Sequence, residues 1–277
     1  MAGGQGSKRR RTEIRNSANI KEETPAAEGP DASASVSIIK LEEKAEQDAS
    51  SSKVEVKQES GTKVSANEKK LIVLLDGCHL ETIKVKDQYQ LLNTDDHSHI
   101  LKKRKEKEGD ARPDITHQCL MTLLDSPLNK AGLLQIYIRT VGNILVEVHP
   151  EIRIPRTFKR FSGLMVELLH RFSIRSAQGG TKLMKVIKNP VTQYFPANTR
   201  KIGLEISQEK LVPLDDYVKA NFTETSNPVV FVVGGFSHGD ISPGFVEETV
   251  SISSYNLSAS VTCGKLCSSF ETLWGVL

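Results

Sequence analysis

A glycine-rich loop that follows an apolar run is the first part of the sequence with the means to bind a ligand. Val229–Val233 is entirely apolar, and Gly234, Gly235 and Gly239 follow it within six residues. Glycines at the carboxyl end of a strand let backbone N–H groups approach a ligand, and α/β folds usually bind ligands at that edge. The spacing is not Gly-x-Gly-x-x-Gly, and the lack of Gly-Lys-Ser/Thr excludes a P-loop. The loop is therefore either a ligand site or an ordinary tight turn.

A second segment is unusually rich in hydroxyl groups. Residues 251–260 read Ser-Ile-Ser-Ser-Tyr-Asn-Leu-Ser-Ala-Ser and join a predicted strand to the last predicted helix. Small polar residues can offer N–H and carbonyl groups to the edge of an adenine. The helix that follows adds N–H groups with no partner inside the helix. The alternative is a structural loop in which Ser258 caps that helix.

The third segment is basic, and its charges are spaced for phosphate binding. Residues 151–175 contain six Lys or Arg against two Glu. Arg156 and Arg160 are four residues apart, so a helix would place both guanidinium groups on one face, where they could bind phosphates. A solvated helix face is the alternative. The Lys-Lys-Arg-Lys run at 102–105 predicts a second basic segment, in a loop.

Arg112 and Asp114 flank Pro113 at the start of a predicted helix. Asp114 occupies the position expected of an N-cap, which is its structural interpretation. A carboxylate beside an arginine could instead hold the edge of a nucleobase or accept a proton. The sequence leaves both interpretations open.

Residue types that bind metals give no complete ligand set. His97 and His99 form a His-x-His pair, but no further ligand lies nearby, so we expect them in a loop. Cys263 and Cys267 are four residues apart on a predicted helix, which favours small side chains that face the core. No apolar run approaches the roughly 20 residues needed to span a bilayer, so no membrane association is expected.

Strands and helices are expected together around these segments, without a strict alternation. The apolar runs that predict strands are 71–75, 202–206, 229–233 and 246–252, and 133–138 with 144–148 predicts a hairpin. The helical periodicities cover 114–125, 158–172 and 258–274. The expected class is α/β, with a hairpin inserted or appended.

Composition divides the chain into a tail and one domain. All fifteen aromatic residues and all four cysteines lie in 71–277, and residues 1–70 carry 13 of the 37 Lys and Arg and 12 of the 34 Asp and Glu. We expect a disordered tail at 1–68 and a folded domain at 69–277. Lys8–Arg11 in the tail suggests a nuclear import signal, and three short aliphatic-Lys-x-Glu stretches resemble sumoylation sites.

Four long blocks carry a more specific signal than any of these patterns. They are 111–132, 152–170, 229–239 and 251–266. Together they closely resemble the SPOUT-class pseudouridine N1-methyltransferases of small-subunit ribosomal RNA, the nucleolar essential protein family. The resemblance covers essentially all of 69–277, and it is loosest over 197–226.

The resemblance implies an α/β fold with a C-terminal trefoil knot, and a homodimer. It places S-adenosyl-L-methionine in the knot, with contacts from Leu204, Gly234, Gly239, Ile252, Ser253, Ser254, Tyr255, Asn256 and Leu257. It assigns RNA contacts to Arg112, Asp114, Arg153, Arg156 and Arg160. The implied substrate is a pseudouridine in 18S-type ribosomal RNA, and the implied setting is the nucleolus of the nucleus, among pre-ribosomal assembly factors.

Methyl transfer to N1 of pseudouridine requires that the N1 proton leaves. On the strength of the resemblance, Asp114 is expected to hold or accept that proton, and Arg112 to orient the carboxylate or a phosphate. The alternative function is an RNA-binding ribosome assembly factor whose methyltransferase fold is mainly structural. Intact glycines at 234 and 239 favour a working cofactor site.

Overall fold

The computed structural model describes residue 65 and residues 68–277, apart from 108, 178, 225–226 and 240–242. The predicted tail, with its basic cluster and lysine motifs, lies outside the described residues except at positions 65 and 68. Its boundary with the folded domain stays a prediction.

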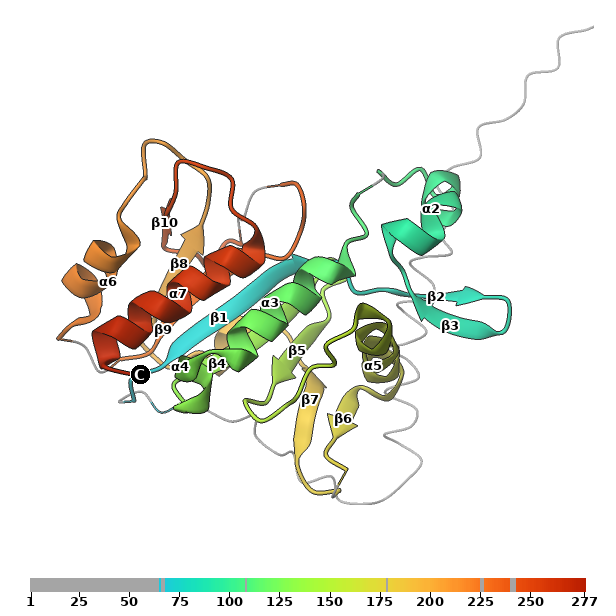
Figure 1. Ribbon diagram of the computed structural model, residues 1–277, viewed down its shortest axis with the longest axis horizontal. Helices are drawn as coiled ribbons and strands as arrows, with labels where there is room; N and C mark the ends of the chain where they lie inside the picture. Colours follow the sequence, from blue (N-terminus) through green and yellow to red (C-terminus); the bar gives the residue numbers. More distant parts are fainter. Residues whose placement is uncertain (1–64, 66–67, 108, 178, 225–226, 240–242) are drawn as a thin grey trace, which may run out of the picture. The chain divides into compact units, whose positions relative to one another are not determined.

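The described residues form an eight-stranded mixed sheet in the order β10-β8-β9-β1-β4-β5-β7-β6 (Figure 1). Neighbours from β10 to β4 are parallel, and neighbours from β4 to β6 are antiparallel. The strands are β1 (Leu71–Cys78), β4 (Leu134–Thr140), β5 (Leu145–Val148), β6 (Ser173–Arg175), β7 (Lys182–Ile187), β8 (Arg200–Leu204), β9 (Val229–Gly234) and β10 (Glu248–Val250). The predicted hairpin is confirmed as β4 and β5, and β10 is shorter than the predicted strand.

Strand β1 lies between β9 and β4, and residues 71–75 have no exposed surface. A continuous apolar run is what a strand buried on both faces requires. Leu71, Val73 and Leu75 pack into the larger core, while Ile72 and Leu74 pack into a smaller one. Because β1, β8, β9 and β10 are parallel, their carboxyl ends meet at one edge of the sheet.

Helices cover the face of the larger core. Helices α3 (Pro113–Asp125) and α7 (Ala259–Trp274) lie side by side there, and α5 (Phe158–Arg171) packs beside them (Figure 1). The shorter α4 (Pro127–Lys130) and α6 (Leu214–Phe222) both contact α7. These helices confirm the three predicted from periodicity, and Ser258 caps α7 as expected.

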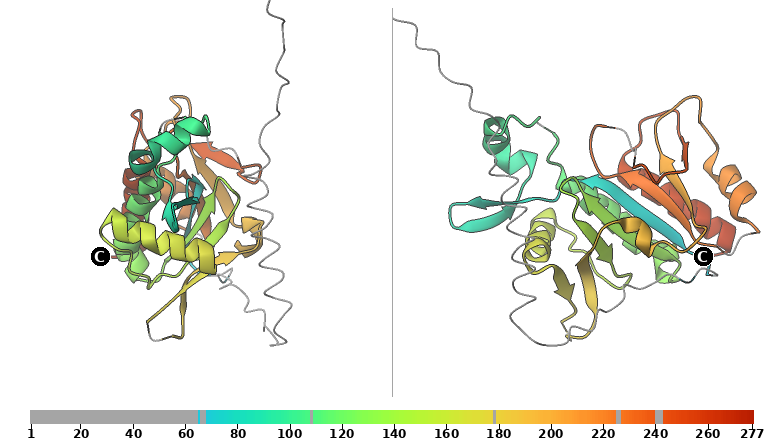
Figure 2. Two further views of the ribbon diagram at one scale, coloured as in Figure 1. Left: turned by 90° about the vertical axis from the view of Figure 1, so that its right-hand side faces the viewer. Right: turned by 180° about the vertical axis from the view of Figure 1, so that it is seen from behind.

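The opposite face of the sheet is covered differently. The 3-10 helix η1 (Val191–Tyr194) supplies Val191 to a core with Tyr137 and Val230. Figure 2, seen from behind, shows the strands in front of the helices of the larger core. The site described below lies at the strand ends between these two faces.

A small lobe follows β1 and was not predicted. The hairpin of β2 (Thr82–Val85) and β3 (Gln88–Leu91) accompanies α2 (Thr94–Lys103). Ile83 from the hairpin and Leu101 from α2 belong to one small core.

Two loop predictions fall within this lobe; the one for the histidines is wrong, and the one for 102–105 holds only for Arg104 and Lys105, which follow the helix. His97 and His99 belong to α2, and the buried His97 ring accepts a hydrogen bond from the Asn93 N–H at 3.2 Å. Lys102 and Lys103 form the last turn of α2, where cations interact favourably with the helix dipole. The high charge of this segment concealed its helix.

Candidate functional site

A cavity of about 230 Å³ opens at the carboxyl ends of β8, β9 and β10. Three segments that are distant in the sequence meet there because the parallel strands share a direction. The lining residues are Leu204, Glu205, Ile206, Val233, Gly234, Phe236, Ser237, Gly239, Ser251, Ile252, Ser253, Tyr255, Asn256, Leu257, Ala259 and Thr262.

Every residue that the sequence assigned to the cofactor lines this cavity, except Ser254. The two loops that spacing alone left undecided therefore form one cavity. The residues that sequence reasoning missed are neighbours of those it named, such as Glu205, Phe236 and Thr262. Their signal was position in the sequence, since Glu205 lies near the end of a predicted strand, Phe236 follows another, and Thr262 lies near the start of the last predicted helix.

The glycine loop has no room for side chains at two of its positions. A Cβ on Gly235 would lie 2.3 Å from the Cys78 Sγ, and a Cβ on Gly234 would lie 2.9 Å from the Phe236 ring. Gly239 has a φ of +130°, a conformation that side chains rarely adopt. The loop therefore needs its glycines to bring backbone to the cavity.

An ion pair lies next to the start of the glycine loop. The Arg139 guanidinium donates two hydrogen bonds to the Asp76 carboxylate, at 2.5 and 2.8 Å, and lies 5.6 Å from the centre of the Phe245 ring. The hydrogen bond to Asp76 raises the pKa of Arg139 further above its ordinary value. The Asp76 carbonyl accepts a hydrogen bond from the Gly235 N–H at 2.6 Å, so β1 holds the start of the loop.

The hydroxyl-rich segment uses several of its polar groups to hold its own shape. The Ser251 hydroxyl donates to the Ser253 carbonyl, and the Ser253 hydroxyl accepts from the Tyr255 N–H. Ser258 accepts from the Val261 N–H and caps α7. The cavity beside them combines apolar walls with polar side chains such as Asn256 and Thr262, a lining that suits a nucleoside.

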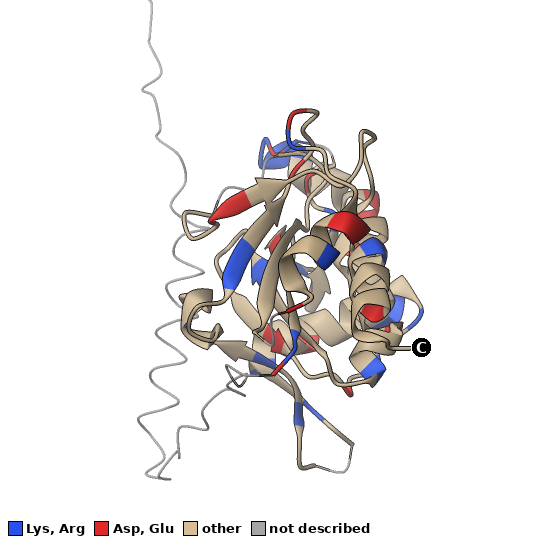
Figure 3. Cartoon of the chain, turned by 90° about the vertical axis from the view of Figure 1, so that its left-hand side faces the viewer, with Lys and Arg blue, Asp and Glu red and all other residues tan. Residues whose placement is uncertain are grey.

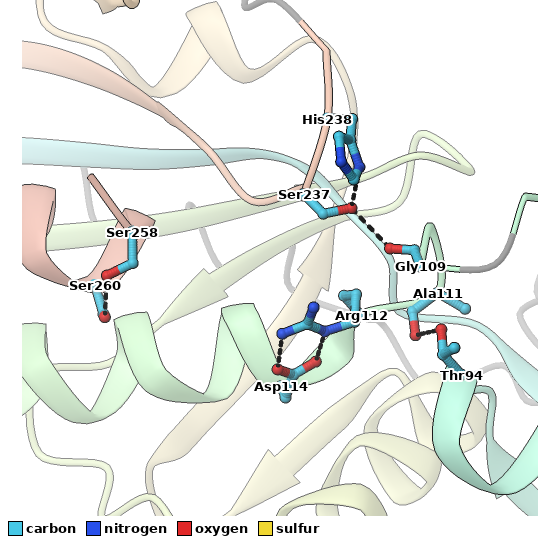
Figure 4. Close-up of polar contacts among 9 residues, drawn as sticks. All are labelled: Thr94, Gly109, Ala111, Arg112, Asp114, Ser237, His238, Ser258 and Ser260. Atoms are coloured by element: carbon cyan, nitrogen blue, oxygen red, sulfur yellow. Dashed lines mark hydrogen bonds and ion pairs between the residues drawn. The ribbon is translucent and has the colours of Figure 1, made fainter. Parts of the chain in front are cut away.

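Arg112 and Asp114 do not line the cavity, but they lie on a segment tied to its loop. The Ser237 hydroxyl donates to the Gly109 carbonyl at 2.7 Å, three residues before Arg112 (Figure 4). The Arg112 guanidinium donates to both Asp114 carboxylate oxygens, each at 2.7 Å, which raises the pKa of Arg112. The prediction that Asp114 caps the helix is wrong, because Pro113 begins α3 and Arg112 is the N-cap.

The predicted arginine pair is only partly helical. Arg160 lies in the first turn of α5, but Arg156 precedes that helix and forms an ion pair with Asp125. The expectation that one helix face carries both is therefore wrong. Arg153, Arg156 and Arg160 are all exposed, outside the cavity. Figure 3 views the chain from the β10 end of the sheet, and the Lys and Arg segments there are interspersed with Asp and Glu segments.

The cysteines are packing residues. Cys78, Cys119 and Cys263 have no exposed surface, and burial raises the pKa of Cys267 to about 11. Among the described residues, no group of three or more His, Cys, Asp or Glu is arranged to hold a metal ion. None of the described helices is long and apolar enough to cross a membrane.

Comparison with known proteins gives the family. The model of the EMG1/NEP1 methyltransferase family matches residues 73–271. The chain belongs to the EMG1/NEP1 methyltransferase family. This confirms the resemblance on which the site residues were predicted, and the matched range contains every one of them.

Curated members of the EMG1/NEP1 family share about half of their residues with this chain. "Ribosomal RNA small subunit methyltransferase NEP1" of Homo sapiens is 52% identical over 218 residues, which cover 79% of this chain and 86% of the human protein. The protein of the same name from Drosophila melanogaster is 50% identical over 220 residues, 77% of this chain and 86% of its own length.

A solved structure supports the fold. The Archaeoglobus fulgidus Nep1 structure, described as bound to S-adenosylhomocysteine, superposes with a TM-score of 0.62 at 22% identity. It covers 74% of this chain and 99% of its own. The SPOUT-class α/β fold is thereby confirmed, while the trefoil knot stays a prediction.

Proposed function

We propose that this protein transfers the methyl group of S-adenosyl-L-methionine to N1 of a pseudouridine in small-subunit ribosomal RNA, as a step of ribosome biogenesis. The observation that supports the proposal is the cavity at the ends of β8, β9 and β10, which is lined by most of the residues that the resemblance assigns to the cofactor. The relatives named above are ribosomal RNA small subunit methyltransferases, and the solved Nep1 is described as bound to S-adenosylhomocysteine.

The cavity fits the cofactor by its chemistry. Leu204, Ile252 and Leu257 supply apolar walls, and the glycine loop brings backbone close to the cavity. When bound, the cofactor would supply a methyl group on a sulfonium, from which methyl transfer is intrinsically favourable. The residues of the chain then have to align donor and acceptor, exclude water and receive one proton.

Arg112 and Asp114 are suited to binding RNA rather than the cofactor. They form a hydrogen-bonded, half-exposed pair outside the cavity, on the segment that Ser237 ties to the glycine loop. Arg153, Arg156 and Arg160 would bind phosphates farther along the strand. The target base has to be unstacked to reach the methyl group, and a single-stranded loop lowers that cost.

The homodimer belongs to the same proposal. Exposed apolar side chains border the cavity: Ile206 and Tyr255 line it, Leu211 pairs with Ser251, and Val261 lies in the first turn of α7. A second copy would cover them. We expect sedimentation to give a dimer, and Val261→Glu to weaken it. A monomer at micromolar concentration would contradict this part.

Nuclear and nucleolar localisation, and contact with pre-ribosomal assembly factors, rest on the resemblance and on the Lys8–Arg11 cluster. Replacing those four residues by alanine in a fluorescent fusion should move the protein out of the nucleus. Unchanged localisation would assign import to another signal.

The decisive experiment uses the full chain, radiolabelled S-adenosyl-L-methionine and three RNA hairpins. The hairpins differ only in carrying pseudouridine, uridine or N1-methylpseudouridine at one loop position. We expect label only in the pseudouridine hairpin, as N1-methylpseudouridine after nuclease digestion. A folded protein that binds the RNA but transfers no label would favour the assembly-factor alternative.

A further inference from the structure

His238 lies at the edge of the cavity and has no place in the mechanism so far. Its chain neighbours Ser237 and Gly239 both line the cavity, and its own ring is exposed. The His238 Nδ1 lies 3.0 Å from the Ser237 Oγ (Figure 4). A histidine at this place could exchange protons with a base that enters the cavity.

The hydrogen bonds of Ser237 determine where the proton of His238 lies. A serine hydroxyl has a single proton, and Ser237 donates it to the Gly109 carbonyl at 2.7 Å. The same oxygen can then only accept from His238, so Nδ1 must carry the hydrogen. A neutral imidazole with its hydrogen on Nδ1 has a lone pair on Nε2. Among the residues that the structure describes, no hydrogen bond occupies that Nε2.

Asp114 is less available than this imidazole to accept a proton from a base in the cavity. Both of its carboxylate oxygens already accept hydrogen bonds from Arg112, at 2.7 Å each. A proton that arrives at Asp114 would have to displace or share one of these two hydrogen bonds. Asp114 is also absent from the cavity lining, whereas the residues on both sides of His238 belong to it.

We propose that His238 is the proton acceptor of the methyl transfer, and that Ser237 is the positioning residue that fixes its tautomer. The inference rests on the proposed function. As the N1–C bond forms and the C–S bond of the sulfonium breaks, the electron pair of that bond goes to sulfur. The N1 proton moves to Nε2, and the imidazolium later releases it to water. Asp114 and Arg112 then serve RNA binding alone.

The first test does not depend on methyl-transfer activity. Nitrogen-15 NMR of the full chain, labelled at histidine and recorded where imidazole is neutral, distinguishes the two tautomers. We expect His238 to carry its hydrogen on Nδ1, and Ser237→Ala to abolish that preference. A His238 signal with the hydrogen on Nε2 would overturn the inference, whatever the outcome of the methyl-transfer assay.

The second test separates proton transfer from support of the loop. Asn can place its amide N–H where Nδ1 was, so His238→Asn can keep the bond to Ser237 but has no basic nitrogen. We expect single-turnover methyl transfer to fall by about 10²-fold or more, because general bases contribute about 10²–10⁴-fold. S-adenosylhomocysteine and RNA affinities should stay unchanged, and added imidazole should partly restore His238→Ala.

The outcomes distinguish the two proposals. No transfer by the wild type would overturn the proposed function, and with it the role of His238. Transfer by the wild type that persists in His238→Asn would overturn only the role of His238. Loss of cofactor affinity in His238→Asn, without rescue of His238→Ala by imidazole, would also overturn it and would make His238 a support of the loop.

Discussion

The proposed cofactor cavity and the arginine surface of Arg153, Arg156 and Arg160 are built from different kinds of groups. The cavity lies in the parallel half of the sheet, where backbone and small residues form the walls and a Cβ at Gly235 would meet Cys78 at 2.3 Å. The arginine surface lies outside it, where exposed guanidinium groups such as Arg153 and Arg160 project into solvent. The first depends on packing and the second on charge, so they should fail under different perturbations.

The largest expected effect is that of Gly235→Ala. The new Cβ would meet Cys78 and lie 3.3 Å from the Asp76 carbonyl, so β9 and the loop must shift. Overpacking of this kind costs about 1–3 kcal/mol of unfolding free energy, and S-adenosylhomocysteine binding should be lost. Denaturant unfolding and calorimetry measure the two. Cys78→Ala should restore part of both losses, and a double variant no better than Gly235→Ala would show that the contact is not the cause.

The ion pair of Asp76 and Arg139 should have a smaller effect, and this effect should appear first in the free energy of unfolding. Asp76→Asn leaves the Arg139 guanidinium beside an uncharged amide in a largely buried position. The Asp76 side chain is 12% exposed and the Arg139 side chain is 24% exposed. We expect a loss of about 2 kcal/mol, below the range for fully buried pairs. Cofactor affinity should fall several-fold. Asp125→Asn is the matched control, because its pair with Arg156 is exposed and should cost less than about 0.5 kcal/mol. Equal losses of unfolding free energy in the two variants would refute the distinction between the buried and the exposed ion pair.

The arginine surface should respond to salt and leave the cofactor unaffected. Replacing Arg153, Arg156 and Arg160 by alanine removes up to three phosphate contacts. The slope of log affinity for single-stranded RNA against log salt should then fall by about 2, at roughly 0.7 per contact. Fluorescence anisotropy at several salt concentrations measures the slope, and calorimetry should find unchanged S-adenosylhomocysteine affinity. An unchanged slope would place the RNA elsewhere.

The smallest effect is a pH dependence of stability at the end of β1. Burial lowers the pKa of His79, although Asp110 and Glu106 act in the opposite direction. The unfolded chain therefore binds a proton more readily than the folded protein. The contribution of His79 to stability is complete above the ordinary histidine pKa and is lost as the pH falls through the lowered one. His79→Gln should lose less stability than the wild type between about pH 7.5 and pH 5. A parallel loss in the two proteins would contradict this.

Periodicity predicted the elements whose burial is simple. Val229–Val233 and the helix at 114–125 gave clear patterns because each buries a continuous run or one face. The α2 lobe was missed because its core is small and its surface is charged. Asp114 was misassigned because Pro113 takes the first helical position, and Arg156 because α5 begins two residues later.

The site needed more than local pattern. Nothing in the sequence places β9 between β1 and β8, and this order is what brings the two loops together. Asp76 and Arg139 are 63 positions apart and pair only through the sheet. Only the family resemblance connected the glycine loop with the hydroxyl-rich loop. The tautomer of His238 could be inferred only from the structure, in which the Ser237 hydroxyl donates its hydrogen to the Gly109 carbonyl.

The most direct test of the central claim is calorimetry of S-adenosylhomocysteine with the full chain and two glycine variants. Gly234→Val would push against the Phe236 ring at the cavity wall, whereas Gly163→Ala adds a methyl group on α5 with nothing within 4 Å. The cavity assignment predicts that the wild type and Gly163→Ala bind alike, and that Gly234→Val, still folded, loses measurable binding. Binding by Gly234→Val at the affinity of the wild type would contradict it and place the cofactor outside this cavity.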